Sequence, residues 1–177
     1  MSGAIALSAI ASLRVGTGLV TAVIPDRCLE TVAIFHPCIM TRPLSDDPQG
    51  RFALDAAVAL DSILPTASAI GCGPGMTTCP GSIRIVERLL HWQLPCVLDA
   101  DAINALSLLE ETVWKQQVAD RAQSAPLILT PHPGELALLT GVAASDREAQ
   151  ISTASQLCDD YGLFIVVKGA QTVVVGP

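Results

Sequence analysis

Short apolar runs rich in β-branched residues alternate along this chain with stretches that repeat apolar residues every three or four positions. The short runs are apolar throughout, which favours strands buried on both faces. The alternation predicts an α/β fold: a mostly parallel, doubly wound sheet with helices on both faces. We expect strands at Gly18–Ile24, Ala67–Gly71, Cys96–Leu98, Pro126–Thr130 and Leu163–Val167, with a hairpin partner at Thr172–Val175. We expect helices at Ile5–Val15, Arg51–Leu64, Ser82–Trp92, Ala102–Leu109 and Arg147–Tyr161, and a polar loop at Pro43–Gly50.

The composition narrows the functions open to such a fold. The chain has 177 residues, which suits a single domain spanning residues 1–177. Half of the residues are hydrophobic and 15% are charged, which excludes an intrinsically disordered chain. Aromatic residues make up 3%, and the formal net charge is -7. We therefore expect no binding to nucleic acid or to an anionic membrane surface.

The cysteines and histidines form no metal-binding pattern. The six cysteines include no CxxC pair, and His36, His91 and His132 form neither HxxxH nor HExxH. We therefore expect no metal centre, and buried free thiols in a reducing cytoplasm. The apolar opening MSGAIALSAIASL is expected to be a core helix, because Arg14 interrupts it too early for a membrane span.

Two expected strands end in loops whose residues could bind a ligand at the carboxyl edge of the sheet. The glycine-rich loop Gly71–Met76 would let an oxyanion approach the backbone, although an ordinary tight turn explains it equally well. Asp99 follows the next strand, where it could meet a substrate hydroxyl or a hydrated magnesium ion. Asp101 is better explained as a helix N-cap, and Asn104 could face the same cleft.

Two further strands end in loops of the same kind. His132 lies between two prolines, which present its imidazole stiffly, and Glu135 could begin the next helix. A structural histidine is as plausible here as one that contacts a ligand. Lys168 follows the last buried strand and could reach a phosphate as a point charge, the alternative being a solvated lysine on a surface hairpin.

The chain carries five segments in a fixed order: GAIALSAIASLRVGTGLVTAVIP, AIGCGPG, PCVLDADAINAL, LILTPHPGELALLTG and IVVKGAQTVVV. Together they resemble the ADP/ATP-dependent NAD(P)H-hydrate dehydratases of the ribokinase-like superfamily. The resemblance runs from Gly3 to Val175 and is most specific in TPHPGE and KGAQT. It implies a ribokinase-like fold and an enzyme that uses ADP or ATP, with Mg2+, to remove water from hydrated NADH and NADPH.

The resemblance also implies roles for particular residues. Ala4, Gly75 and His132 would contact the hydrated dinucleotide. The adenine nucleotide would be held by Lys168, Gly169, Ala170, Gln171 and Thr172. The loops considered above point independently to His132 and to the segment Lys168–Thr172, called the lysine turn below. They add Asp99 and Asn104 as substrate-binding candidates.

The chain departs from the family at both ends. The family's GTGD-type segment, which supplies the catalytic aspartate, would follow Pro177, and the glycine-rich strand before the first helix is missing. We therefore expect an incomplete domain whose catalytic residue lies beyond Pro177. Exposed sheet edges would favour self-association into a homo-oligomer. Many members of the family also have an epimerase partner, which is fused or separate.

Two other functions stay open at this point. One is a ribokinase-like small-molecule kinase of the hydroxyethylthiazole-kinase type, against which the TPHPGE segment argues. The other is a truncated, non-catalytic nucleotide-binding protein, which the missing GTGD-type segment favours. The residues of the chain do not distinguish ADP from ATP as the co-substrate.

Overall fold

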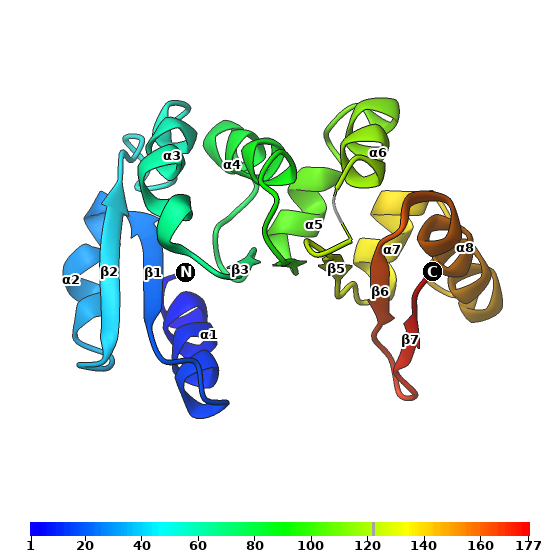
Figure 1. Ribbon diagram of the computed structural model, residues 1–177, viewed down its shortest axis with the longest axis horizontal. Helices are drawn as coiled ribbons and strands as arrows, with labels where there is room; N and C mark the ends of the chain where they lie inside the picture. The colour runs from blue at the N-terminus through cyan, green and yellow to red at the C-terminus, as the bar shows by residue number, and fades with distance from the viewer. Residues whose placement is uncertain (122) are drawn as a thin grey trace.

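The computed structural model describes residues 1–121 and 123–177 and arranges them as two sheets with helices (Figure 1). Its strands are β1 (Val20–Pro25), β2 (Ile39–Leu44), β3 (Ile70–Cys72), β4 (Cys96–Leu98), β5 (Leu127–Leu129), β6 (Phe164–Val167) and β7 (Val173–Val175). The smaller sheet pairs β1 with β2, and the larger sheet has the order β3-β4-β5-β6-β7. Neighbouring strands run parallel, except that β7 returns antiparallel to β6.

Helical segments connect the parallel strands. The α-helices are α1 (Ser2–Arg14), α2 (Leu29–Ala33), α3 (Leu60–Ile63), α4 (Pro80–Leu90), α5 (Asp101–Leu106), α6 (Glu111–Ala119), α7 (Pro133–Thr140) and α8 (Arg147–Tyr161). Short 3-10 turns form η1 (Asp26–Cys28), η2 (Ala56–Ala59) and η3 (Leu64–Thr66). In Figure 1, α4, α5 and α6 lie on one side of β3 to β5. Among the described residues, no helix has both the length and the hydropathy needed to cross a bilayer.

Several elements agree with the sequence-based expectations, and the α/β class is confirmed. β4 and α8 have the predicted bounds, and β7 forms the predicted hairpin with β6. α8 begins where the Asp146 carboxylate accepts a hydrogen bond from the Ala149 amide at 3.0 Å. It ends at Gly162, whose φ of 67° is left-handed. Local capping signals therefore set both ends of this helix.

The segment Arg51–Leu64 does not form the single helix that its periodicity predicts. It contains η2, the one-turn helix α3 and the start of η3 instead. Its apolar residues are nevertheless buried, and Leu60 shares a cluster with Ile85 and Leu89 of α4. The pattern thus indicated the buried face correctly. Pro65 lies one residue beyond this segment, in η3, so it does not account for the break inside it.

The sequence-based expectation contains no strand at β2, and the last two residues of β2 fall in the predicted loop Pro43–Gly50. Pro43 and Leu44 are the last residues of β2, and Pro43 stands opposite Ile24 of β1. Proline cannot donate to a strand ladder and is tolerated mainly at sheet edges. β2 is an edge strand of its two-stranded sheet, so the proline fits there.

The larger sheet is buried mainly on one face, not on both as expected. Cys96 and Leu98 of β4 are buried, whereas Val97 between them is 37% exposed, and Phe164 at the start of β6 is 38% exposed. The buried residues of β4, β5 and β6 join those of α5 to α8 in the largest core cluster. A separate cluster is formed by residues of α1, β1, α2 and β2. A third cluster lies between the two sheets and joins them: Leu44 of β2 packs there with Ile85 and Leu89 of α4, and Ile70 of β3 packs against it.

Candidate functional site

Charged side chains from two strands meet at the carboxyl edge of the larger sheet. Asp99 directly follows β4, and Lys168 directly follows β6. The Lys168 ammonium donates a hydrogen bond to the Asp99 carboxylate and forms an ion pair with it. Thr130, which directly follows β5, also donates from its side chain to Asp99. The sequence predicts that these loops share one edge of the sheet, and the structure places Asp99 and Lys168 in direct contact.

Thr130 has no assigned role in the sequence analysis, although it is the first residue of the TPHPGE segment. Its position directly after β5 could have indicated it, because the other candidate residues, Asp99 and Lys168, also directly follow strands. Backbone bonds tie the same loops together: the Lys168 amide donates to the Pro131 carbonyl at 2.9 Å, and the Thr130 amide to the Leu98 carbonyl at 3.1 Å. The strand ends thus form one connected edge.

His132 caps α7 in addition to being held between two prolines. Its Nδ1 accepts hydrogen bonds from the amides of Gly134 at 3.0 Å and Glu135 at 3.2 Å. The Glu135 carboxylate accepts from the His132 amide at 2.9 Å and lies 3.0 Å from Nε2. Because Nδ1 accepts in this network, the ring proton is assigned to Nε2. The imidazole is fixed in orientation, and its side chain is 57% exposed.

The glycine-rich loop after β3 brings two predicted substrate residues together. Gly75 has a φ of 75°, and a Cβ built on it would lie 2.9 Å from the Cβ of Ala4. The Met1 ammonium donates to the Gly75 carbonyl at 2.5 Å. Gly73, in the same loop, lies against the backbone of Asp99, because a Cβ built on Gly73 would lie 1.7 Å from the Asp99 carbonyl oxygen. The backbone of this loop therefore passes so close to the backbone of Asp99 that only glycine fits at position 73.

Asp101 is not the N-cap of α5, as the sequence suggested. The cap position is taken by Ala100, and Asp101 is the first helical residue, whose carboxylate accepts from the Thr77 amide at 2.9 Å. Asn104 lies in the first turn of α5, and its Oδ1 is buried without a hydrogen-bond partner among the described residues. Among the described residues no hydrogen bond links the Asn104 side chain to the Asp99–Lys168 pair, so its role in binding stays a prediction.

Ala100 has a backbone conformation that is rare for a residue with a side chain. Its φ is 50° and its ψ is -124°. Such conformations cost about 1–3 kcal/mol and are concentrated at functional sites, where the surrounding structure enforces them. The backbone of Ala100 is constrained by its two chain neighbours, because Lys168 holds Asp99 and Asp101 begins α5. The strain supports the carboxyl edge after β4 as the functional region.

The Asp99 carboxyl is held in its charged form. Partial burial raises the pKa of Asp99, but hydrogen bonds from the side chains of Lys168 and Thr130 outweigh it. The charge of Lys168 and the backbone N–H of Ala100 lower the pKa further. The net result is a pKa below the ordinary value of 3.8. The ion pair is therefore formed at neutral pH and is lost only as the pH falls through that lowered pKa.

This arrangement predicts the titration of Asp99. Followed by NMR through its carboxyl carbon, Asp99 should titrate with a midpoint below 3.8, the ordinary value. Replacing Lys168 by methionine should raise that midpoint, because both a donor and a positive charge are removed. A wild-type midpoint at or above the ordinary value would contradict the ion pair described here.

All six cysteines are free thiols, as expected, but only Cys79, Cys96 and Cys158 are buried. Cys28 and Cys72 are half-buried, and Cys38 is exposed. Burial raises the pKa of Cys96 to about 12 and that of Cys158 to about 11, and it also raises the pKa of Cys72 at the end of β3. None of these three is a thiolate at neutral pH, so none serves as a nucleophile.

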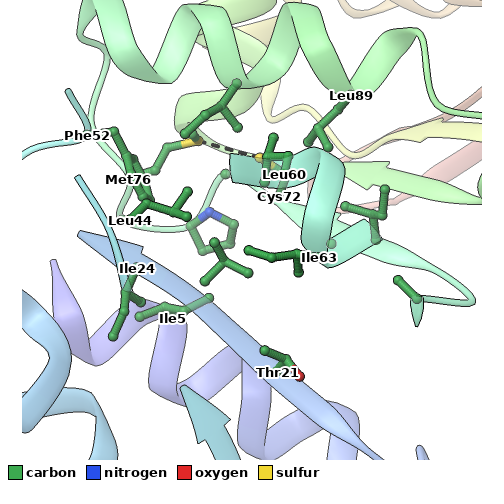
Figure 2. Close-up of a pocket in the computed structure, with 18 of the residues that line it drawn as sticks. Ile5, Thr21, Ile24, Leu44, Phe52, Leu60, Ile63, Cys72, Met76 and Leu89 are labelled. Atoms are coloured by element: carbon green, nitrogen blue, oxygen red, sulfur yellow. Dashed lines mark hydrogen bonds between the residues drawn. The ribbon is translucent and has the colours of Figure 1, made fainter. Parts of the chain in front are cut away.

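A cavity lies between the two sheets, away from Asp99 and Lys168. It has a volume of about 650 Å3 and is lined by residues of α1, β1, α3 and β3. Figure 2 shows apolar side chains pointing into it, among them Ile5, Leu60 and Ile63. Gly75 lines this cavity, but Asp99, His132 and Lys168 do not. A charged ligand needs polar partners, which favours the strand ends over this cavity as the candidate site.

The arrangement defines a class of protein. Parallel strands carry an acidic loop, a histidine loop and a lysine turn at one carboxyl edge, where open α/β folds bind ligands. A ribokinase-like superfamily protein of Enterococcus faecalis has the same fold, with a TM-score of 0.73 over 98% of this chain and 55% of its own, at 20% identity. The chain thus has the α/β fold of that protein.

The family follows from the sequence comparison. The model of the NAD(P)H-hydrate dehydratase family matches residues 1–177, and this chain belongs to that family. It is 37% identical to the bifunctional NAD(P)H-hydrate repair enzyme Nnr of Moorella thermoacetica, over 100% of this chain and 32% of the relative. The corresponding enzyme of Salinibacter ruber is 36% identical over 99% of this chain and 32% of the relative.

A solved structure extends the likeness to the whole described fold. The ADP/ATP-dependent NAD(P)H-hydrate dehydratase of Bacillus subtilis, co-crystallised with ATP and Mg2+, is 26% identical. It has a TM-score of 0.74 and covers 100% of this chain, which in turn covers 57% of that protein. The chain spans about a third of the length of the curated relatives and under two thirds of this solved structure.

Proposed function

We propose that this chain belongs to an enzyme that removes water from hydrated NADH and NADPH, with ADP or ATP as the co-substrate. The observation that carries the proposal is the position of Lys168. It lies at the carboxyl end of β6, is paired with Asp99, and belongs to the KGAQT segment that resembles the family's nucleotide-binding loop. The family match along the chain supports the same function.

In this proposal the two ligands lie side by side along the carboxyl edge. The Lys168 ammonium contacts a phosphate as a point charge. The remaining nucleotide-binding residues are Gly169, Ala170, Gln171 and Thr172. The hydrated dinucleotide contacts Ala4, Gly75 and His132, with Asp99 and Asn104 as further candidates. The backbone bond from Lys168 to Pro131 supports this, because it joins the nucleotide turn to the His132 loop.

The reaction requires the substrate hydroxyl to become a leaving group. Transfer of the terminal phosphoryl group of ADP or ATP to that oxygen releases AMP or ADP, and a carboxylate takes the hydroxyl proton. The C–O bond then breaks, phosphate leaves with the bonding electrons, and loss of a proton from the neighbouring ring carbon restores the double bond. We assign that carboxylate to no residue of this chain. The resemblance puts it in a GTGD-type segment that would follow Pro177.

Magnesium would neutralise phosphate charge in this site. Within residues 1–121 and 123–177, no three Asp, Glu, His or Cys side chains lie together as a metal centre. Mg2+ is commonly bound by one or two carboxylates together with substrate phosphates and water. Asp99 would be the protein carboxylate that shares in holding it.

We extend the proposal to partners and location. The curated relatives are named bifunctional, and we propose that an epimerase, fused or separate, acts on the same hydrated dinucleotides. We also propose that the protein is cytoplasmic, and that the unpaired edges of β1 and β3 favour self-association.

The function is tested by incubating the complete enzyme to which this chain belongs with hydrated NADH and with ADP, ATP or no nucleotide. We expect the absorbance of reduced nicotinamide to return only when a nucleotide is present, and comparison of ADP with ATP then identifies the co-substrate. Phosphorylation of a thiazole alcohol without that recovery would favour a kinase. Binding of ADP by calorimetry with neither reaction would favour a non-catalytic nucleotide-binding protein.

A further inference from the structure

The first turn of α8 contacts the backbone of both loops that flank the candidate site. Arg147 is the first residue of this helix. Its guanidinium donates to three backbone carbonyls, one at the end of β6 and two in the lysine turn. The acceptors are Lys168 at 3.0 Å, Val167 at 3.1 Å and Gln171 at 2.7 Å. One side chain therefore holds both ends of the turn.

Gln150 extends the same contact to the neighbouring loop. It lies three residues after Arg147, on the same face of α8, and is fully buried. Its Nε2 donates to the Pro133 carbonyl at 2.8 Å, directly after His132. The first turn of one helix therefore holds the histidine loop and the lysine turn in a fixed relation.

Arg147 uses its charge on backbone carbonyls and on no carboxylate. Within residues 1–121 and 123–177, no ion pair includes it. It also packs closely under the turn, because a Cβ built on Gly169 would lie 3.3 Å from the guanidinium carbon. A side chain that satisfies three acceptors at once restricts the conformations open to this turn.

These contacts determine where the amides of the turn point. In a trans peptide the C=O and N–H groups point in opposite directions. With the Lys168 carbonyl directed at Arg147, the N–H of Gly169 is directed away from it. The Gln171 carbonyl has the same effect on the N–H of Thr172. Arg147 thus aims two amides to the side of the turn opposite itself, where they can bind an anion.

We propose that Arg147 is a positioning residue of the nucleotide site, which aims the amides of Gly169 and Thr172 at a phosphate, while Gln150 keeps the His132 loop in register. This inference rests on the proposed function, because it assumes that the lysine turn binds nucleotide. Arg147 itself contacts no ligand; it acts through the backbone of the turn.

The test compares Arg147→Met, which removes every donor, with Arg147→Lys, which restores part of them. Hydrogen–deuterium exchange without ligand should rise in the segment 168–172 of the methionine variant, and less in the lysine variant. The dissociation constant for ADP, measured by calorimetry well below the melting temperature, should rise about tenfold in Arg147→Met, since hydrogen bonds to a charged group are lost. The lysine variant should lie between it and the wild type.

The matched control is Arg84→Met, which removes an exposed arginine paired with Glu87 on α4. It should change neither the exchange of segment 168–172 nor the affinity for ADP. The proposal is overturned if Arg147→Met raises exchange evenly along the chain, or if segment 168–172 and ADP affinity are both unchanged. If the wild-type protein binds no ADP, the proposed function fails, and the exchange result alone still decides whether Arg147 orders the turn.

Discussion

Replacing Gly73 by alanine should destabilise the protein by at least about 3 kcal/mol, because overpacking and backbone strain act together. The added Cβ would lie 1.7 Å from the carbonyl oxygen of Asp99 and 2.7 Å from its carbonyl carbon. These are backbone atoms, so they can yield only if the loop after β4 moves. The φ of 129° at Gly73 adds strain for any residue with a side chain. Urea unfolding followed by tryptophan fluorescence measures the loss.

Gly71 provides a matched control two residues earlier. A Cβ built on Gly71 meets no atom within 4 Å, and its φ lies outside the left-handed region. Gly71→Ala should therefore change the free energy of unfolding by less than about 1 kcal/mol. If the two variants lost equal stability, the close approach of Gly73 to Asp99 would not be the cause.

Replacing Lys168 by methionine should weaken ADP binding roughly a hundredfold, because a charge-assisted contact to phosphate is lost and the Asp99 carboxylate is left unpaired. Calorimetric titration with ADP measures the effect. Lys115, the other lysine of the chain, is paired with Glu111 on α6 and provides the control. Lys115→Met should leave ADP affinity near the wild-type value.

A second substitution separates the two contributions. Adding Asp99→Asn to Lys168→Met removes the unpaired carboxylate and should recover part of the lost affinity, because like charges no longer meet at the phosphate. Wild-type affinity in the Lys168→Met variant would exclude the lysine turn from the nucleotide site. A double variant weaker than the single one would show that Asp99 contributes to binding directly.

The sequence predicted the order of the elements well, because that order depends on local signals. The ends of α8 follow from Asp146 and Gly162, and β4 is a short, continuous apolar run. Tertiary context decided the elements that were missed. Pro43 is tolerated in β2 because the strand lies at an edge, and Arg51–Leu64 keeps its buried face while forming short helical turns in place of one helix.

The site was predictable as a set of loops but not as a set of contacts. Successive parallel strands bring Asp99, Thr130 and Lys168 to one edge, and the sequence indicates that much for the acid and the lysine. The pairing of Asp99 with Lys168, the cap formed by His132 and the three carbonyls held by Arg147 depend on rotamers and loop paths. The binding roles of Ala4, Gly75 and Asn104 stay predictions.

The separation of the two sheets has a consequence for folding cooperativity. No strand pairing joins β1 and β2 to the larger sheet, and the two sheets are joined by side-chain packing, in which Leu44 of β2 shares a cluster with Ile85 and Leu89 of α4. Local opening free energies differ across a structure, and a short sheet that is held by side-chain packing and not by the larger strand ladder is expected at the lower end. The amides of β1 should therefore exchange through a cheaper opening than those of β5. Trp114 packs in the core around β4 and β5, whereas Trp92 packs against the cluster that contains Leu44 of β2, so tryptophan fluorescence reports on both regions.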